Sequence, residues 1–376
     1  MTTATELDRS NHIESHLSLL SQQGQMYLPP RDLSGIVVPT IRPESLGEAA
    51  GLARDIGCPI VALCSTPTQA REARKKLAAN PPGMLAAAIP HNPPGILGGL
   101  LSFLTTRHPE NDVLPSCHND IARKRNIGLL IARLSGWQTV MFLDDDIRGL
   151  TAETVSQAVA LTEKYRAVGF TIGDYPDNSV VCHAHRLSGG SQETFPGGSA
   201  LILDVGQFDG LFPAIYNEDW LFLYDAVRNG SLGVGGPLRQ LRYQPFENAR
   251  RAASEEFGDV IAEGLFRLIH EGRSVADARA DFWVSMLERR ARLIEEIADR
   301  LLLREENLQL IGAALMSLTA ARKRLAAISP LACLSFVRAW RADVDTWQGR
   351  LRALPRLGSL AEAAKYLTLT AMRGGR

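Results

Sequence analysis

Short apolar runs alternate with amphipathic stretches through the first part of the chain. The runs predict buried strands, because a strand inside a parallel sheet is apolar on both faces. The amphipathic stretches, in which apolar residues recur every three or four positions, predict helices that cover the sheet. We expect strands at 34–40, 59–64 and 84–89 and helices at 43–56 and 68–79. Strands that alternate with helices indicate a parallel, doubly wound α/β sheet.

The alternation resumes after a stretch rich in proline and glycine at 80–115. The elements expected there are helices at 120–135 and 151–165, strands at 139–143, 168–172 and 179–183, a glycine turn that leads into a strand over 195–204, and a helix that opens at 217–222. Beyond about residue 250 the strand signals end and long amphipathic helices follow, at 281–304 and 307–328.

This pattern predicts a tail at 1–30, an α/β domain at 31–250 and an α-helical domain at 251–376. The apolar faces of the last helices are expected to pack on the α/β domain. The alternative is that they pack on a second subunit and make a homo-oligomer.

Composition narrows the class of protein. The 376 residues contain 41 Lys and Arg and 41 Asp and Glu, so no net charge favours nucleic acid as a partner. The five cysteines are scattered and odd in number, which favours a reducing cytoplasm over a disulfide framework. The N-terminal stretch lacks the pattern of a signal peptide. No apolar run approaches the ~18 residues of a membrane helix, so we expect no integral membrane segment.

Three consecutive carboxylates, Asp144, Asp145 and Asp146, follow the apolar run that ends at Leu143. At the carboxyl end of a buried strand they would lie in the crevice where open α/β sheets bind ligands. Adjacent carboxylates repel, and a hard divalent cation is one remedy. Asp144 and Asp146, two apart on an extended segment, would point to the same side. The alternative is a solvated acidic turn.

A basic segment, Arg123-Lys124-Arg125, lies near the start of the helix at 120–135. Cations there oppose the preference of a helix N-terminus for anions. They are therefore expected to face something negative, either a phosphate or the Asp144 cluster. A solvated basic turn is the alternative.

Four segments, in this order, carry a resemblance to a known family. They are Val38-Pro39-Thr40-Ile41-Arg42-Pro43; Ala122 to Leu129 around Arg125; Phe142-Leu143-Asp144-Asp145-Asp146; and Gly197-Gly198-Ser199-Ala200, followed by Phe208 to Phe212 and Glu218-Asp219-Trp220. The sequence resembles nucleotide-sugar glycosyltransferases of the A-type fold. It is most similar to the large inverting family with D-x-D and E-D motifs. The resemblance covers about 33–230.

The resemblance implies a Rossmann-like A-type catalytic domain at 31–250 and a nucleotide-diphosphate sugar donor, with UDP-sugars favoured. Asp146 would be the surer ligand of Mn²⁺ or Mg²⁺, with Asp144 at the metal or the ribose. The residues implied in donor binding are Pro39, Thr40, Arg42, Ser65, Arg125, Asp144 and Asp145.

An inverting displacement needs a general base that deprotonates the acceptor hydroxyl. By resemblance this base is Asp219, and Glu218 would position it or the acceptor, a small molecule or a glycan. Gly197, Gly198 and Trp220 would lie at the acceptor, where Trp220 could stack on a sugar face. The alternatives are a helix cap for Asp219 and core packing for Trp220.

The chain departs from the family in two places. The second strand ends in Cys64-Ser65, where many relatives carry an acidic residue for the base. No histidine lies between His185 and His270 to serve as a late metal ligand, and the stretch 243–248 offers only Gln, Glu or Asn.

Two other classes remain open. The carboxylates could belong to a haloacid-dehalogenase-like phosphatase, although Arg148 breaks that motif. The chain could also be a sugar-nucleotide-binding or mutase-like protein. His183 and His185 would share a face on a strand, but zinc needs three or four ligands and no second cluster is apparent.

Overall fold

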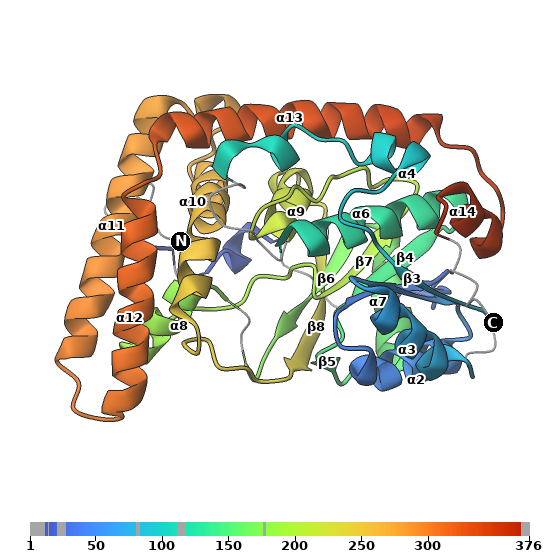
Figure 1. The fold of residues 1–376 in the computed structure, drawn as a ribbon, viewed down its shortest axis with the longest axis horizontal. Helices are drawn as coiled ribbons and strands as arrows, with labels where there is room; N and C mark the ends of the chain where they lie inside the picture. Colours follow the sequence, from blue (N-terminus) through green and yellow to red (C-terminus); the bar gives the residue numbers. More distant parts are fainter. Residues whose placement is uncertain are drawn as a thin grey trace.

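A computed structural model describes residues 12–13, 15–20, 28–79, 83–110, 118–175 and 178–369. Its centre is a sheet of eight strands in the order β3-β2-β1-β4-β7-β6-β8-β5 (Figure 1). The strands are β1 (Ile36–Thr40), β2 (Ile60–Cys64), β3 (Met84–Ala88), β4 (Thr139–Leu143), β5 (Ile147–Arg148), β6 (Ala167–Ile172), β7 (Ala200–Asp204) and β8 (Leu232–Gln240).

The sheet is mixed, so the predicted parallel arrangement is confirmed for the first three strands and is wrong for the sheet as a whole. β3, β2, β1 and β4 run parallel, but β7 runs antiparallel to both β4 and β6, and β5 is antiparallel to β8. β7 begins beside the end of β4, where Ala200 pairs with Leu143. Its direction was hidden because the first four residues of β7 are buried and apolar, as in a parallel strand.

Helices cover both faces of the sheet. Alternate residues of β1 point to opposite faces, with Val37 in one buried cluster and Ile36 and Val38 in the other. Helices α2 (Gly47–Ile56), α3 (Pro67–Leu77) and α7 (Ala152–Ala160) contribute to the second cluster. Helices α6 (His118–Leu134) and α9 (Glu218–Arg228) contribute to the first.

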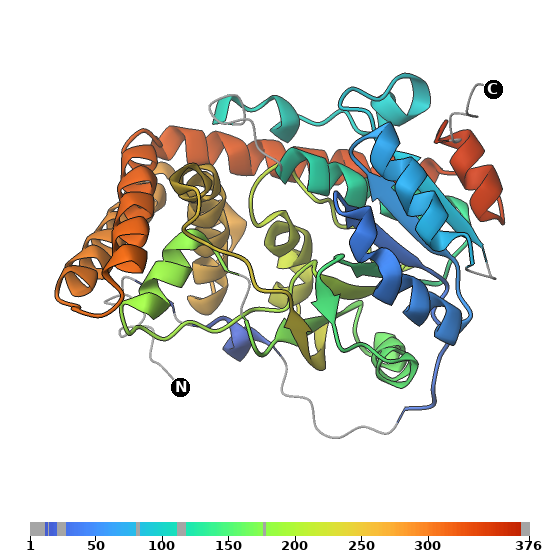
Figure 2. The same cartoon turned by 60° about the horizontal axis from the view of Figure 1, so that its bottom comes forward.

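The last third is helical, as predicted. Its helices are α10 (Ala249–His270), α11 (Ala280–Leu302), α12 (Leu308–Leu325), α13 (Pro330–Ala353) and α14 (Leu360–Tyr366). Figures 1 and 2 show α13 running along one side of the molecule, from α11 and α12 to the sheet half. Trp347 on α13 donates its indole N–H to the carbonyl of Gly210 at 2.8 Å. One buried cluster joins Phe142 of β4 to Trp340 of α13, so these helices share the core of the sheet half.

The apolar faces of α11 and α12 pack largely within the chain. Leu293, Ile297 and Leu318 are buried, whereas Leu308 is exposed. No helix in the described ranges is both long enough and apolar enough to cross a membrane.

The strand expected at 179–183 is a helix, α8 (Val180–Leu187). Ser179 caps it, because its side chain accepts a hydrogen bond from the amide of Cys182. The prediction is wrong because residues 180–185 are all buried, so the sequence shows no polar face to reveal the helical period. The shorter elements are α4 (Gly95–Leu100), η1 (Leu17–Leu19), η2 (Pro43–Leu46), η3 (Thr105–Arg107), η4 (Leu161–Glu163) and η5 (Val275–Asp277).

Candidate functional site

The acidic turn lies between β4 and β5, at the carboxyl ends of the parallel strands. The amide of Asp144 donates to the carbonyl of Ser199 at 2.8 Å, which ties the turn to the start of β7. The antiparallel direction of β7 therefore brings Gly197 and Gly198 beside the three carboxylates.

Asp145 faces the end of β1. The Thr40 hydroxyl donates to Asp145 Oδ2 at 2.5 Å, and Arg42 pairs with Asp145 Oδ1. Thr40 in turn accepts the amide of Arg42 at 2.9 Å. Asp145 is buried with both oxygens engaged, so these contacts fix the turn against β1. The neighbouring Pro39 is buried inside β1.

Asp144 faces α6. Arg125 lies 3.0 Å from both oxygens of Asp144 through Nη2 and pairs with Glu218 through Nη1. Its side chain is 3% exposed. Arg125, the last residue of the basic segment, therefore faces the acidic cluster, one of the two partners expected from the sequence.

The first turn of α9 brings Glu218 and Asp219 to the same place. Asp219 accepts the amide of Gly198 at 2.6 Å through Oδ2 and the amide of Trp220 at 2.9 Å through Oδ1. A Cβ on Gly197 would collide with Asp219 Oδ2, and a Cβ on Gly198 would lie 2.5 Å from Arg125 Nη1. The two glycines thus allow Asp219 and Arg125 to approach the turn closely. The N-cap of α9 is Asn217, not Asp219.

Five carboxylates converge here on two guanidinium groups. The carboxylates are Asp144, Asp145, Asp146, Glu218 and Asp219, and the guanidinium groups belong to Arg42 and Arg125.

The excess of negative charge affects the acids themselves. Burial raises the pKa of Glu218 to about 8, because Asp219 and Asp144 add to the effect and Arg125 only partly opposes it. Burial likewise raises the pKa of Asp144 to about 7, again opposed by Arg125. Both pKa values are therefore raised mainly by burial and further by the neighbouring carboxylates, which Arg125 only partly offsets.

Ser65 belongs to a neighbouring cluster that sequence reasoning missed. Lys124 Nζ donates to the Ser65 hydroxyl at 2.8 Å and to the carbonyl of Thr40 at 3.0 Å. Asp120 accepts from Ser65 at 2.7 Å and pairs with Lys124 at 2.6 Å. Lys124 is 2% exposed. The spacing of four residues between Asp120 and Lys124 was the available signal.

Asp146, the surer metal ligand by resemblance, faces Arg42 and Gln240. Its Oδ2 accepts from Arg42 at 3.1 Å and from the Gln240 amide at 3.5 Å. Carboxylate and amide oxygens suit Mn²⁺ and Mg²⁺. Asp144 and Asp146 carry such oxygens, and Gln240 would join them at a cation if its amide turned, because it presents its nitrogen to Asp146 in this structure. Within the described ranges, no three His, Cys, Asp or Glu side chains are grouped to hold a metal. Gln240, the last residue of β8, lies just before the stretch 243–248 in which a late ligand was expected.

Trp220 packs in an aromatic group. Its ring centroid lies 5.0 Å from that of His16, 5.5 Å from Phe195 and 4.7 Å from Phe266. The packing alternative therefore describes its position in this structure, and stacking on a sugar stays a prediction.

His183 and His185 do not form a metal pair. They lie two positions apart on α8, and residues with that spacing on a helix do not face each other. His183 contacts the Tyr243 hydroxyl at 2.8 Å. Burial, with Arg186 and Arg251 nearby, lowers the pKa of His183 to about 3. The expectation of a shared face on a strand is wrong.

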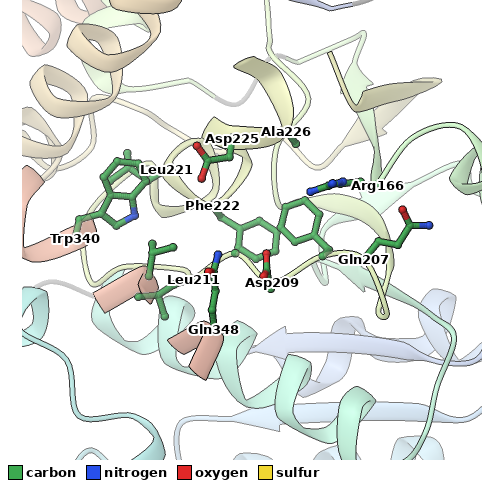
Figure 3. Close-up of a pocket in the computed structure, with 13 residues that line it drawn as sticks. Arg166, Gln207, Asp209, Leu211, Leu221, Phe222, Asp225, Ala226, Trp340 and Gln348 are labelled. Carbon is green, nitrogen blue, oxygen red and sulfur yellow. The ribbon is translucent and has the colours of Figure 1, made fainter. Parts of the chain in front are cut away.

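A separate hollow lies between the 207–211 loop, α9 and α13 (Figure 3). It measures about 420 Å³, including space open to solvent, and Phe222, Asp225 and Trp340 help to line it. None of the site residues predicted from the sequence lines it.

No protein-family model and no curated protein matches the chain. Among solved structures, the chain is similar to the mannosyltransferase PcManGT from Pyrobaculum calidifontis, in complex with GDP-Man and Mn²⁺. That match has a TM-score of 0.42 and 14% identity, and covers 94% of this chain and 92% of that one.

Proposed function

We propose that the chain is a metal-dependent glycosyltransferase. It would move a sugar from a nucleotide-diphosphate donor to a hydroxyl or similar acceptor, with inversion and with UDP-sugars favoured as donors. The observation that carries the proposal is the imbalance of charge at the carboxyl edge of the sheet, where five carboxylates face two guanidinium groups. A divalent cation would offset the excess negative charge.

The residues on the β1 side would bind the donor. Asp144, Asp146 and Gln240 would hold Mn²⁺ or Mg²⁺, and the ion, when bound, would neutralise the charge that grows on the leaving diphosphate. The Arg42 side chain is 45% exposed, so it can turn from Asp145 and Asp146 toward an incoming phosphate.

The residues on the α9 side would act on the acceptor. Asp219 would take the proton of the attacking hydroxyl as the general base. Its contacts with the amides of Gly198 and Trp220 fix the carboxylate and leave lone pairs on both oxygens. Glu218, paired with Arg125, would orient the neighbouring groups.

The test is a turnover assay with UDP-, GDP- and dTDP-sugars, with Mn²⁺ or with a chelator. The proposed enzyme is expected to release nucleoside diphosphate from its donor only when metal is present. Phosphate release would favour the phosphatase, and binding without release would favour the mutase-like or binding protein.

Two variants test the proposed roles of Asp146 and Asp219. Asp146→Asn is expected to abolish metal-dependent turnover, whereas Asp299→Asn on the exposed side of α11 keeps it. Asp219→Asn is expected to lose turnover and retain donor binding. Full turnover and metal dependence in Asp146→Asn would refute the proposal.

A further inference from the structure

The helical part of the chain contacts the site through Asn217, the residue just before Glu218. Asn217 is the N-cap of α9 and has a left-handed backbone, with φ 59° and ψ 35°. Its side-chain amide donates to Asp259 Oδ1 of α10 at 2.8 Å. A buried carboxylate of α10 is therefore hydrogen-bonded to the residue two positions before the proposed base, Asp219.

The contact between α10 and this turn is close. Gly258 precedes Asp259, and a Cβ added to Gly258 would collide with the carbonyl of Tyr216. The segment at 216–217 thus packs directly on the backbone of α10. A glycine at 258 is what permits this approach.

Asp259 is itself held by a buried arginine of α11. Arg290 Nη2 lies 2.6 Å from Asp259 Oδ2, and Arg290 also binds both oxygens of Glu256 at 2.8 and 3.0 Å. Each of the three side chains is at most 6% exposed. Buried charges persist only when their partners are well placed, so the arrangement has little freedom to shift.

The left-handed conformation of Asn217 sets the direction in which α9 starts. A residue with a Cβ enters this region at a cost, and asparagine enters it more readily than most others. The bond to Asp259 holds Asn217 there. Without it, the amides of Trp220 and Leu221, which donate to the carbonyl of Asn217 at 3.1 and 3.3 Å, would lose a fixed acceptor.

We propose that Arg290, Asp259 and Asn217 act together as positioning residues that set the geometry of Glu218 and Asp219. This inference rests on the proposed function for the roles of the two acids. It gives α10 and α11 a part in the reaction that the sequence did not indicate. None of the three residues needs to touch a substrate.

The experiment replaces Asn217 and leaves the charged pair intact. Removing Arg290 would leave Asp259 and Glu256 buried without an opposite charge, which destabilises the fold itself and would obscure any effect on the site. Asn217→Gly keeps the left-handed backbone accessible and removes only the bond to Asp259.

The chain supplies a matched control. Asn307 is also a left-handed N-cap, with φ 54°, at the start of α12, and its side chain makes no capping hydrogen bond. Asn307→Gly deletes the same atoms from the same backbone conformation, away from the site.

The first measurement is amide hydrogen exchange, which does not depend on any activity. In Asn217→Gly the amides of Gly198, Trp220 and Leu221 are expected to exchange about tenfold faster than in the wild type. In Asn307→Gly they are expected to keep the wild-type rate. Unchanged exchange in Asn217→Gly would overturn the inference.

The second measurement separates positioning from general stability. In Asn217→Gly, kcat is expected to fall about tenfold while the Kd for nucleoside diphosphate with Mn²⁺ and the KM for the donor stay within about twofold. An equal loss of donor binding, or an unchanged kcat, would also overturn the inference. If the wild type turns over no donor, the proposed function fails and the exchange data alone decide whether Asn217 holds the turn.

Discussion

Glu218 provides the sharpest test of the charge imbalance at the site. Glu218→Gln keeps the size of the side chain and an oxygen that can accept from Arg125, but it removes the titrating group. Because the pKa of Glu218 is raised to about 8 by burial, the folded protein binds this proton more tightly than the unfolded chain does.

The sign and the size follow from that shift. A carboxyl with a raised folded-state pKa contributes stability that is complete below its ordinary pKa of 4.5 and is lost as the pH rises through about 8. At ~1.4 kcal/mol per pKa unit, the full shift corresponds to about 5 kcal/mol. Asp144 and Arg125 interact electrostatically with Glu218, so part of this free energy depends on them. We expect Glu218 alone to account for roughly 2–4 kcal/mol of the change in stability with pH.

The assay is urea unfolding at pH 5.5, 7 and 8.5, without metal or nucleotide. The wild type is expected to lose stability relative to Glu218→Gln as the pH rises, by roughly 2–4 kcal/mol between pH 5.5 and pH 8.5. Glu305→Gln, an exposed change in the turn after α11, is expected to follow the wild type. Parallel pH profiles for wild type and Glu218→Gln would refute the reasoning.

Three further changes test the packing of the chain, one at the site and two elsewhere. In Gly198→Ala the new Cβ would lie 2.5 Å from Arg125 Nη1, so we expect a loss of about 1–3 kcal/mol in unfolding free energy and of donor turnover. Gly312→Ala, in the interior of α12 with open space around it, is expected to be neutral or stabilising in the same denaturation assay. Asp343 of α13 accepts from the amide and the hydroxyl of Thr105 at 2.7 and 2.8 Å, so Asp343→Asn is expected to cost about 2–4 kcal/mol; an unchanged urea midpoint would contradict this.

The sequence determined most of what depends on local pattern. The apolar runs located β1, β2 and β4, because a strand buried on both faces has no polar positions. The run that ends at Leu143 also located the acidic turn at a strand end. The amphipathic period located α11 and α12 to within a few residues.

The sequence did not determine the direction of β7 or the nature of α8. Both segments are almost wholly buried, so neither shows the polar positions by which a period is recognised. The direction of β7 depends on how the chain runs through the whole sheet. The chain remains at the carboxyl edge of the sheet between β6 and β7, so β7 starts there and runs antiparallel to β4.

The sequence predicted a turn with three carboxylates that need a cation. Only the tertiary structure shows which side chains contact these carboxylates. Arg125 meets Glu218, which lies 93 residues away, and Gln240 meets Asp146, which lies 94 residues away. The local order of apolar and polar residues indicates which side chains are buried. Which buried charges meet depends on how distant segments pack, and in this chain that packing extends from the turn through Asn217 to Arg290 on α11.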